Sequence, residues 1–89
     1  MRKTIFEPEA LEEFINWGIY DNRKFKKIFE LLKDIARTLH EGIGKPEALK
    51  NQLSGLWSRG IDEKHRLVCF INSNNDIEVL TCKGHYLDK

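Results

Sequence analysis

The sequence predicts an α+β domain in which an N-terminal helical hairpin packs on one face of a small antiparallel sheet. Apolar residues recur at helical spacing through roughly the first forty positions. From Gly55 onward, short β-prone segments alternate with polar turns. Because the helical segments precede the strands, we expect separate helix and sheet layers. At 89 residues, the chain is predicted to form a single domain spanning 1–89.

The N-terminal half carries the two helices. Residues 3–6 are β-prone, and Pro8 suits the first turn of a helix. Asp21 and Asn22 offer a break and a new N-cap. The first helix is predicted from apolar positions at helical spacing: Leu11, Phe14, Ile15, Gly18 and Ile19. The second is predicted from one apolar stripe, opposite a mostly basic face: Phe25, Ile28, Phe29, Leu32, Ile35, Ala36 and Leu39.

The C-terminal half reads as a loop followed by a meander. Residues 40–55 contain three glycines and a proline, which predict a loop with one helical turn over residues 46–50. Three strands are expected over residues 55–61, 66–72 and 77–83, and the short polar turns between them imply antiparallel neighbours.

Alternation along the middle strand predicts which face meets the helices. Leu67, Cys69 and Ile71 are all apolar and are expected on the core face, which turns Arg66 toward the open face. Trp57 is expected in the core. The alternation in the last strand fits either face, and His85 is not assigned to one.

Composition limits the function classes. Fifteen Lys and Arg against 14 Asp and Glu give a net charge of +1, whereas a free-standing nucleic-acid binder usually shows a larger basic excess. The apolar runs are far shorter than the ~20 residues of a membrane span, and no signal-peptide pattern opens the chain. These features predict a cytoplasmic protein. Cys69 and Cys82 are expected to be buried thiols, because their spacing suits no metal site.

Spacing and propensity alone leave the polar residues with ordinary structural interpretations. Arg66 reads as a solvated residue at a strand start, and Glu47 as an acid in a first helical turn. His85 reads as a terminal residue and Tyr86 as a packing aromatic. A soluble α+β domain of unassigned role is all that these patterns establish.

Four sequence blocks add a family resemblance. The run "EGIGKPEALKNQLSGLWSRGIDEKHRLVCFI", followed by "HY" near the end, contains G-x-G-K-P-E-x-L-K, L-S-G-x-W-S-R-x-I, an acidic turn into H-R-L-V, and a terminal H-Y. In these blocks the chain resembles the YoeB/Txe toxins of the RelE-like superfamily. It departs from the family pattern at Gly60, where a second basic residue is usual, at Gly84, where a bulkier residue is common, and in the tail after Tyr86.

The resemblance implies a ribosome-dependent mRNA endonuclease, or mRNA interferase, with a fold similar to microbial RNases. It assigns the catalytic positions to Glu47, Arg66, His85 and Tyr86. In metal-free cleavage by the substrate's 2′-hydroxyl, Glu47 would accept a proton, Arg66 would stabilise the phosphoryl oxygens and His85 would protonate the leaving oxygen. Tyr86 would stack on a base or donate to the phosphate. No cofactor or metal is implied.

The resemblance also implies partners. If the ribosome presents the mRNA, a chain of low net charge suffices, and Lys45, Lys50, Arg59 and Lys64 are expected to contact RNA phosphates, together with the basic face of the second helix. A cognate YefM-like antitoxin would fold a disordered segment over the site. Relatives of this kind look dimeric, which implies a homodimer. The alternatives are a non-catalytic ParE-like toxin and a decayed toxin that acts only by binding protein.

Overall fold

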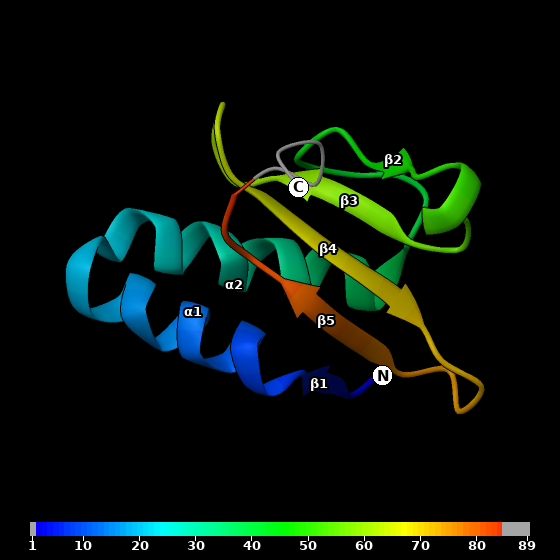
Figure 1. The fold of residues 1–89 in the computed structure, drawn as a ribbon, viewed down its shortest axis with the longest axis horizontal. Helices are drawn as coiled ribbons and strands as arrows, with labels where there is room; N and C mark the ends of the chain where they lie inside the picture. Colours follow the sequence, from blue (N-terminus) through cyan, green and yellow to red (C-terminus); the bar gives the residue numbers. More distant parts are fainter. Residues whose placement is uncertain (1, 85–89) are drawn as a thin grey trace.

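The computed structural model describes residues 2–84 and confirms the α+β class. Both helices lie side by side along one face of the sheet (Figure 1). In chain order the elements are β1 (Thr4–Phe6), α1 (Pro8–Tyr20), α2 (Asn22–Arg37), β2 (Glu47–Ala48), the 3₁₀ helix η1 (Asn51–Leu53), β3 (Trp57–Gly60), β4 (Arg66–Ile71) and β5 (Ile77–Thr81).

Within residues 2–84 the sheet has five strands in the order β1-β5-β4-β3-β2. The predicted antiparallel meander is present as β3, β4 and β5. β1 pairs in parallel with β5, so the complete sheet is mixed and not purely antiparallel. Since β1 and β5 are far apart in the chain, no hairpin turn fixes their relative direction.

The helical hairpin depends on one aspartate between its helices. The Asp21 main-chain N–H donates to the Trp17 carbonyl and closes α1. Its side chain accepts a hydrogen bond from the Arg23 N–H at 3.2 Å and caps α2. Pro8 begins α1, as the sequence predicted. In the part of the chain that the structure describes, neither helix is long and apolar enough to cross a membrane.

The core lies between the two helices and the helix-facing side of the sheet. Leu67 and Cys69 are buried there, which confirms the face predicted for β4. Ile77 and Val79 of β5 alternate into the core. A register shift in the β4–β5 ladder then breaks this alternation, so the next buried residue is Cys82 and not Thr81. The fully buried members of the core come from both layers: Ala10, Ile28, Leu31, Ile35, Leu67, Ile77, Val79 and Cys82.

The helical turn predicted for residues 46–50 is wrong. Glu47 and Ala48 instead form β2, which pairs with β3 in antiparallel register. The Leu49 N–H also donates to the Leu56 carbonyl at 2.9 Å. Pairing with β3 satisfies backbone groups that one isolated helical turn would leave to solvent, which explains why the strand forms.

Candidate functional site

Strand register brings Glu47 and Arg66 to the same face of the sheet. Glu47 lies opposite Ser58 in the β2–β3 pair, while Gly60 lies opposite Arg66 in the β3–β4 pair. Side chains at paired positions share a face, and positions two apart along a strand do so too. Glu47, Ser58 and Arg66 therefore all project from the face that the helices leave open. The prediction that Arg66 turns toward this face is confirmed.

Two hydrogen bonds orient the Arg66 guanidinium. Its Nε donates to Ser58 Oγ at 2.7 Å and its Nη2 donates to the Lys45 carbonyl at 3.1 Å. Ser58 is completely buried, so its hydroxyl is a fixed acceptor. These bonds use two of the five N–H donors of a guanidinium and set the plane of a group that suits phosphate recognition. Ser58 is not among the predicted site residues, although alternation from Trp57 places it on the open face.

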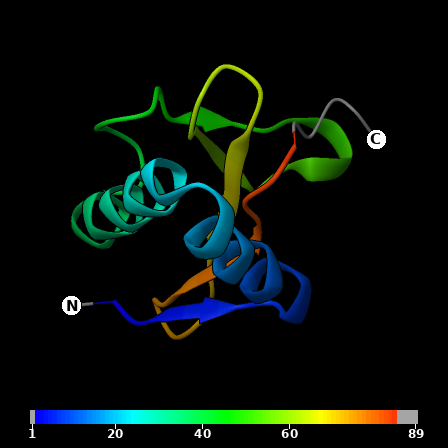
Figure 2. The ribbon, with the colours of Figure 1, turned by 90° about the vertical axis from the view of Figure 1, so that its left-hand side faces the viewer.

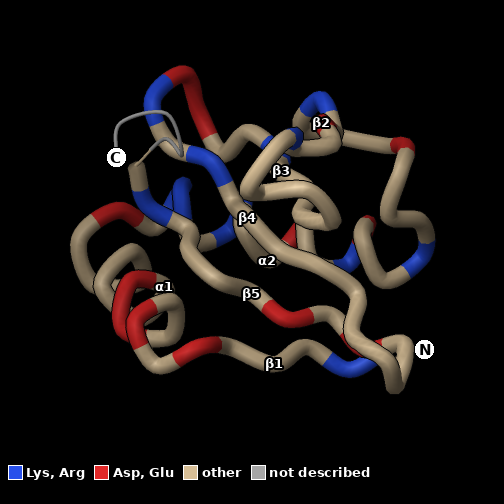
Figure 3. Tube along the Cα trace, turned by 45° about the vertical axis from the view of Figure 1, so that its right-hand side comes forward, with Lys and Arg blue, Asp and Glu red and all other residues tan. Residues whose placement is uncertain are grey.

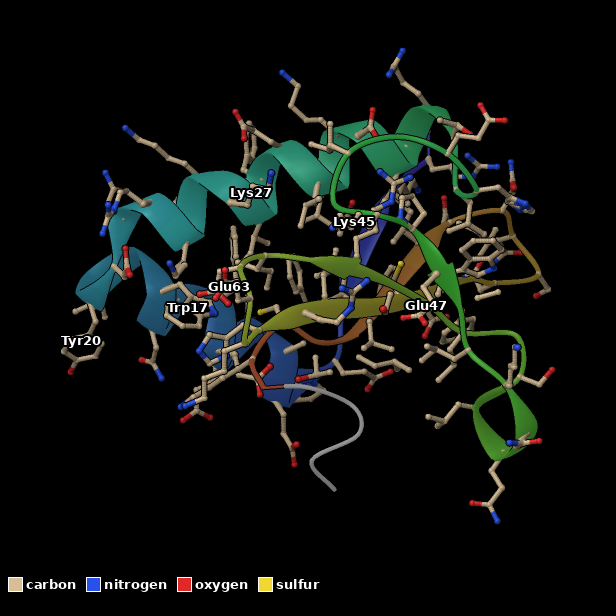
Figure 4. All side chains as sticks on the ribbon, turned by 90° about the horizontal axis from the view of Figure 1, so that it is seen from above. Trp17, Tyr20, Lys27, Lys45, Glu47 and Glu63 are labelled. Atoms are coloured by element: carbon tan, nitrogen blue, oxygen red, sulfur yellow. The ribbon has the colours of Figure 1, made fainter. Side chains whose placement is uncertain are left out.

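Glu47 stands at the exposed edge of the sheet. It comes from the same edge segment as Lys45, as Figure 4 shows. An open groove begins at Glu47 and is lined by the chain as far as Leu53. Glu47 is therefore an exposed residue at one end of this groove.

The chain after β5 returns to the start of β4. Gly84 accepts a hydrogen bond from the Arg66 N–H at 2.9 Å, and its own N–H donates to His65 Nδ1 at 2.8 Å. Figures 1 and 2 both show this segment (red) running alongside the beginning of β4. His85 and Tyr86 lie outside the described residues, but the residue that precedes them is bonded to the Arg66 main chain.

Three of the four residues predicted to contact RNA are exposed. Lys45 and Lys50 flank β2, and Lys64 lies in the β3–β4 turn. Figure 3 shows basic positions around β2 and the start of β4, whereas acidic positions are concentrated on α1. RNA contact by these lysines stays a prediction.

Arg59 does not have the position that an RNA contact requires. It is 1% exposed, because its register partner is the core residue Leu67 and it therefore faces the helices. Its guanidinium forms an ion pair with Asp34. It also donates to four carbonyls of the loop after α2: Thr38 (2.6 Å), Leu39 (3.2 Å), Glu41 (2.8 Å) and Ile43 (3.2 Å). The assignment of Arg59 to the RNA-binding surface is thus corrected: it is a structural residue that fastens this loop.

Asp34 is the anionic centre of that arrangement. Hydrogen bonds from Arg37, at 2.8 Å, and from Arg59 lower the pKa of Asp34 to about 2, with a further bond from the Ile43 N–H, although burial acts in the opposite direction. The carboxylate is thus charged throughout the neutral range. It holds the loop that leads to Lys45, whose carbonyl supports Arg66.

Asp62 organises the β3–β4 turn in a similar way. Burial acts to raise the pKa of Asp62, but main-chain N–H bonds from His65 and Lys64 and the Lys24 ammonium, 3.1 Å away, together lower it. The charged carboxylate therefore fixes the turn immediately before Arg66.

Both cysteines are buried and free, as predicted. Burial raises the pKa of Cys69 to about 11. Burial, with the neighbouring Glu13, raises the pKa of Cys82 to about 12. Among residues 2–84, no group of three or more His, Cys, Asp or Glu side chains is arranged to hold a metal ion.

Comparisons with known proteins agree with the fold and the blocks around this site. Residues 6–86 match the family model described as "YoeB-like toxin of bacterial type II toxin-antitoxin system". Toxin YoeB of Escherichia coli strain K12 is 45% identical over 84 residues, which cover 94% of this chain and 99% of that protein.

Two solved structures from Staphylococcus aureus are similar over nearly their whole length. The YoeB dimer has a TM-score of 0.88 and 44% identity, covering 96% of this chain and 98% of that one. The heterotetrameric YoeB–YefM complex has a TM-score of 0.87 and 44% identity, covering 97% and 99%. This chain therefore belongs to the YoeB-like toxins of bacterial type II toxin–antitoxin systems.

Proposed function

We propose that this toxin is a ribosome-dependent mRNA endonuclease that uses the 2′-hydroxyl of the message as its nucleophile. The supporting observation is the convergence of Glu47 and Arg66 on one open face. Glu47 lies opposite Ser58 in the β2–β3 pair, and Arg66 donates a hydrogen bond to the Ser58 hydroxyl. In addition, the residue that precedes His85 is hydrogen-bonded to the Arg66 main chain.

The proposed reaction divides the proton transfers between two residues. The Glu47 carboxylate accepts the proton of the 2′-hydroxyl while the 2′-oxygen attacks the adjacent phosphorus. The bond between phosphorus and the 5′-oxygen breaks, and the His85 imidazolium donates a proton to that oxygen. The products are a 2′,3′-cyclic phosphate and a 5′-hydroxyl. Each proton transfer is worth roughly 10²–10⁴ in rate.

Arg66 supplies the charge that the transition state needs. Its guanidinium is permanently positive and is oriented by Ser58 and the Lys45 carbonyl before any substrate binds. Pre-oriented donors of this type contribute on the order of 10²–10³ to kcat. Tyr86 is assigned the supporting role of stacking on a base or donating to the phosphate.

Binding of the message is assigned mainly to the ribosome. The net charge of +1 is too small for a free-standing RNA-binding protein, but exposed Lys45, Lys50 and Lys64 can each contribute one salt-sensitive phosphate contact. The similar Staphylococcus aureus proteins form a YoeB dimer and a YoeB–YefM complex. On that basis we assign this chain a YefM-like antitoxin and a homodimeric form. The cytoplasmic location rests on the sequence prediction alone.

Gly60 favours a second candidate, a toxin that acts only by binding protein. A Cβ at this position would lie 3.3 Å from Arg66 Nη1, so the basic residue usual in the family would begin next to the phosphate-binding group. Its replacement by glycine removes one positive charge from the proposed RNA face. A non-catalytic, ParE-like or decayed toxin would block growth or titrate antitoxin without producing new RNA ends.

Mapping of mRNA 5′ ends in a reconstituted translation system separates the candidates. We expect the wild type to create new ends only with ribosomes, and Glu47→Gln, Arg66→Met and His85→Gln to lower the rate by roughly 10²–10⁴. Glu30→Gln, which removes an exposed carboxylate of α2, is the matched control and should cleave at the wild-type rate. Inhibition of translation without any new ends would favour the binding-only toxin. Equal cleavage without ribosomes would refute the role of the ribosome.

A further inference from the structure

The loop over residues 38–45 leads from α2 toward β2 and is held against the domain by one mostly buried ion pair. Arg59 of β3 and Asp34 of α2 form this pair. Asp34 Oδ2 also accepts a hydrogen bond from the Ile43 N–H at 3.1 Å. The Arg59 guanidinium donates to four carbonyls of the loop, those of Thr38, Leu39, Glu41 and Ile43. Figure 4 shows the loop (green) folding back over α2 before the chain reaches β2.

Close contact between the loop and this pair depends on a glycine. Gly42 has a φ of +127°, and a Cβ at this position would lie 1.8 Å from Asp34 Oδ2. A larger residue would therefore displace the carboxylate. Two residues further on, the Gly44 carbonyl accepts a hydrogen bond from the Gly60 N–H at 2.7 Å. The loop is thus fixed to α2 and to β3 directly before Lys45.

Lys45 presents its carbonyl to the Arg66 guanidinium. Arg66 Nη2 donates to this carbonyl at 3.1 Å, and Arg66 Nε donates to Ser58 Oγ at 2.7 Å. Lys45 has a φ of +52°, in the left-handed region that residues other than glycine seldom adopt. Such a conformation persists where the surrounding contacts impose it, and here those contacts are the bonds of the preceding loop. Of the two groups that orient Arg66, the serine belongs to β3, whereas the carbonyl depends on how the loop is held.

We infer that Asp34 and Arg59 are positioning residues for the proposed nuclease site: they hold the 38–45 loop so that the Lys45 carbonyl fixes the plane of the Arg66 guanidinium. This inference rests on the proposed function, because the plane of the guanidinium affects cleavage only if Arg66 binds a phosphate of the message. Neither Asp34 nor Arg59 touches the substrate in this scheme. A misplacement of about 1 Å can cost on the order of 10²-fold in rate, and the bond to Ser58 remains, so we expect a loss of about tenfold.

Conservative substitutions of the ion pair test this inference. Asp34→Asn keeps the shape of the side chain but replaces one acceptor oxygen by a donor, and Arg59→Lys keeps the charge but has three donors for five bonds. We expect each to lower kcat for ribosome-dependent cleavage by about tenfold, with KM changed less than about threefold. Ile77→Val is the matched control, because it removes a methylene group from the core at a position whose strand partners are Thr4 and Ile71. It should cleave at the wild-type rate, and urea unfolding shows that each variant is folded under the assay conditions.

A pair of substitutions at Lys45 tests the carbonyl itself. Lys45→Gly and Lys45→Val both remove the ammonium group, but glycine adopts the left-handed conformation readily and a β-branched residue resists it. Because Lys45 is exposed, neither substitution disturbs the core. We expect kcat of Lys45→Val to be about tenfold below that of Lys45→Gly. Equal kcat values for the two variants would overturn the inference.

A third measurement does not depend on cleavage: the rotation of the Arg66 guanidinium about its Nε–Cζ bond, followed by ¹⁵N NMR. We expect faster rotation in Asp34→Asn and Arg59→Lys than in the wild type and Ile77→Val. Unchanged rotation, or losses of kcat no larger than that of Ile77→Val, would overturn the inference. A wild type that produces no RNA ends would refute the proposed function, and the NMR comparison would then still decide whether the ion pair positions Arg66.

Discussion

Replacement of Arg59 should remove a large part of the stability of the domain. An 89-residue domain has about 4–13 kcal/mol of unfolding free energy at 0.05–0.15 kcal/mol per residue. Arg59→Met leaves Asp34, a mostly buried carboxylate, without its buried partner and leaves four loop carbonyls without their donor. Breaking a buried ion pair on one side costs roughly 3–5 kcal/mol. Arg59→Lys keeps the charge but has three donors for five bonds, and two unmade bonds cost about 2 kcal/mol.

Arg37 provides the matched control, because it also pairs with Asp34 but its side chain is 73% exposed. Arg37→Met should cost less than about 1 kcal/mol. Urea unfolding followed by tryptophan fluorescence measures all three variants, and Arg59→Met should lower the midpoint by roughly 2–4 M. If Arg59→Met and Arg37→Met lowered the free energy of unfolding equally, burial of the Arg59 side chain would not explain its contribution to stability.

Three further predictions concern acid, thiols and backbone strain. The pKa of Asp34 is lowered from 3.8 to about 2, so its contribution is present above about pH 4 and is lost as the pH falls toward 2. Urea midpoints should show this loss, about 1–2 kcal/mol after solvent screening, in the wild type and not in Asp34→Asn. At pH 8, Cys69 and Cys82 should react with iodoacetamide at least about 100-fold more slowly in the folded protein than in urea, because burial raises the pKa of both thiols; fast labelling would contradict this. Gly44→Ala should destabilise more than Gly55→Ala: both have positive φ, which costs about 1–2 kcal/mol, but only the Gly44 Cβ meets a neighbour, Leu31 Cδ2 at 2.8 Å. Equal losses on urea unfolding would contradict the crowding argument.

The fold was predictable wherever periodicity and turn chemistry acted together. The amphipathic pattern of α2, the cap at Asp21 and the alternation around Leu67 each correspond to an element of the structure. β2 was mistaken for a helical turn, because Pro46 and Glu47 suit a helix start and the competing interaction, pairing with β3, comes from a segment ten residues further along the chain. The parallel partner of β1 was equally hidden, since no local signal indicates a pairing over such a separation.

The candidate site was predictable in part, and the error at Arg59 has a clear origin. A basic residue in a block that resembles the YoeB/Txe toxins suggested a phosphate contact. Alternation from Trp57, which was expected in the core, nevertheless puts Arg59 on the core face as well. The same alternation places Ser58 on the open face, where its hydroxyl accepts a hydrogen bond from Arg66. The hydrogen bond from Gly84 to His65 gave no signal in the sequence, because it depends on where the chain returns after β5.

The parallel pairing of β1 with β5 affects how the toxin folds during its synthesis. The Ile77 N–H donates to the Lys3 carbonyl and the Glu7 N–H donates to the Val79 carbonyl, so this edge of the sheet joins segments that lie far apart in the sequence. During translation, β1 has no strand to pair with until β5 has been synthesised. Contacts this distant in sequence form slowly. A nascent chain therefore lacks the finished edge of the sheet until β5 is available to pair with β1.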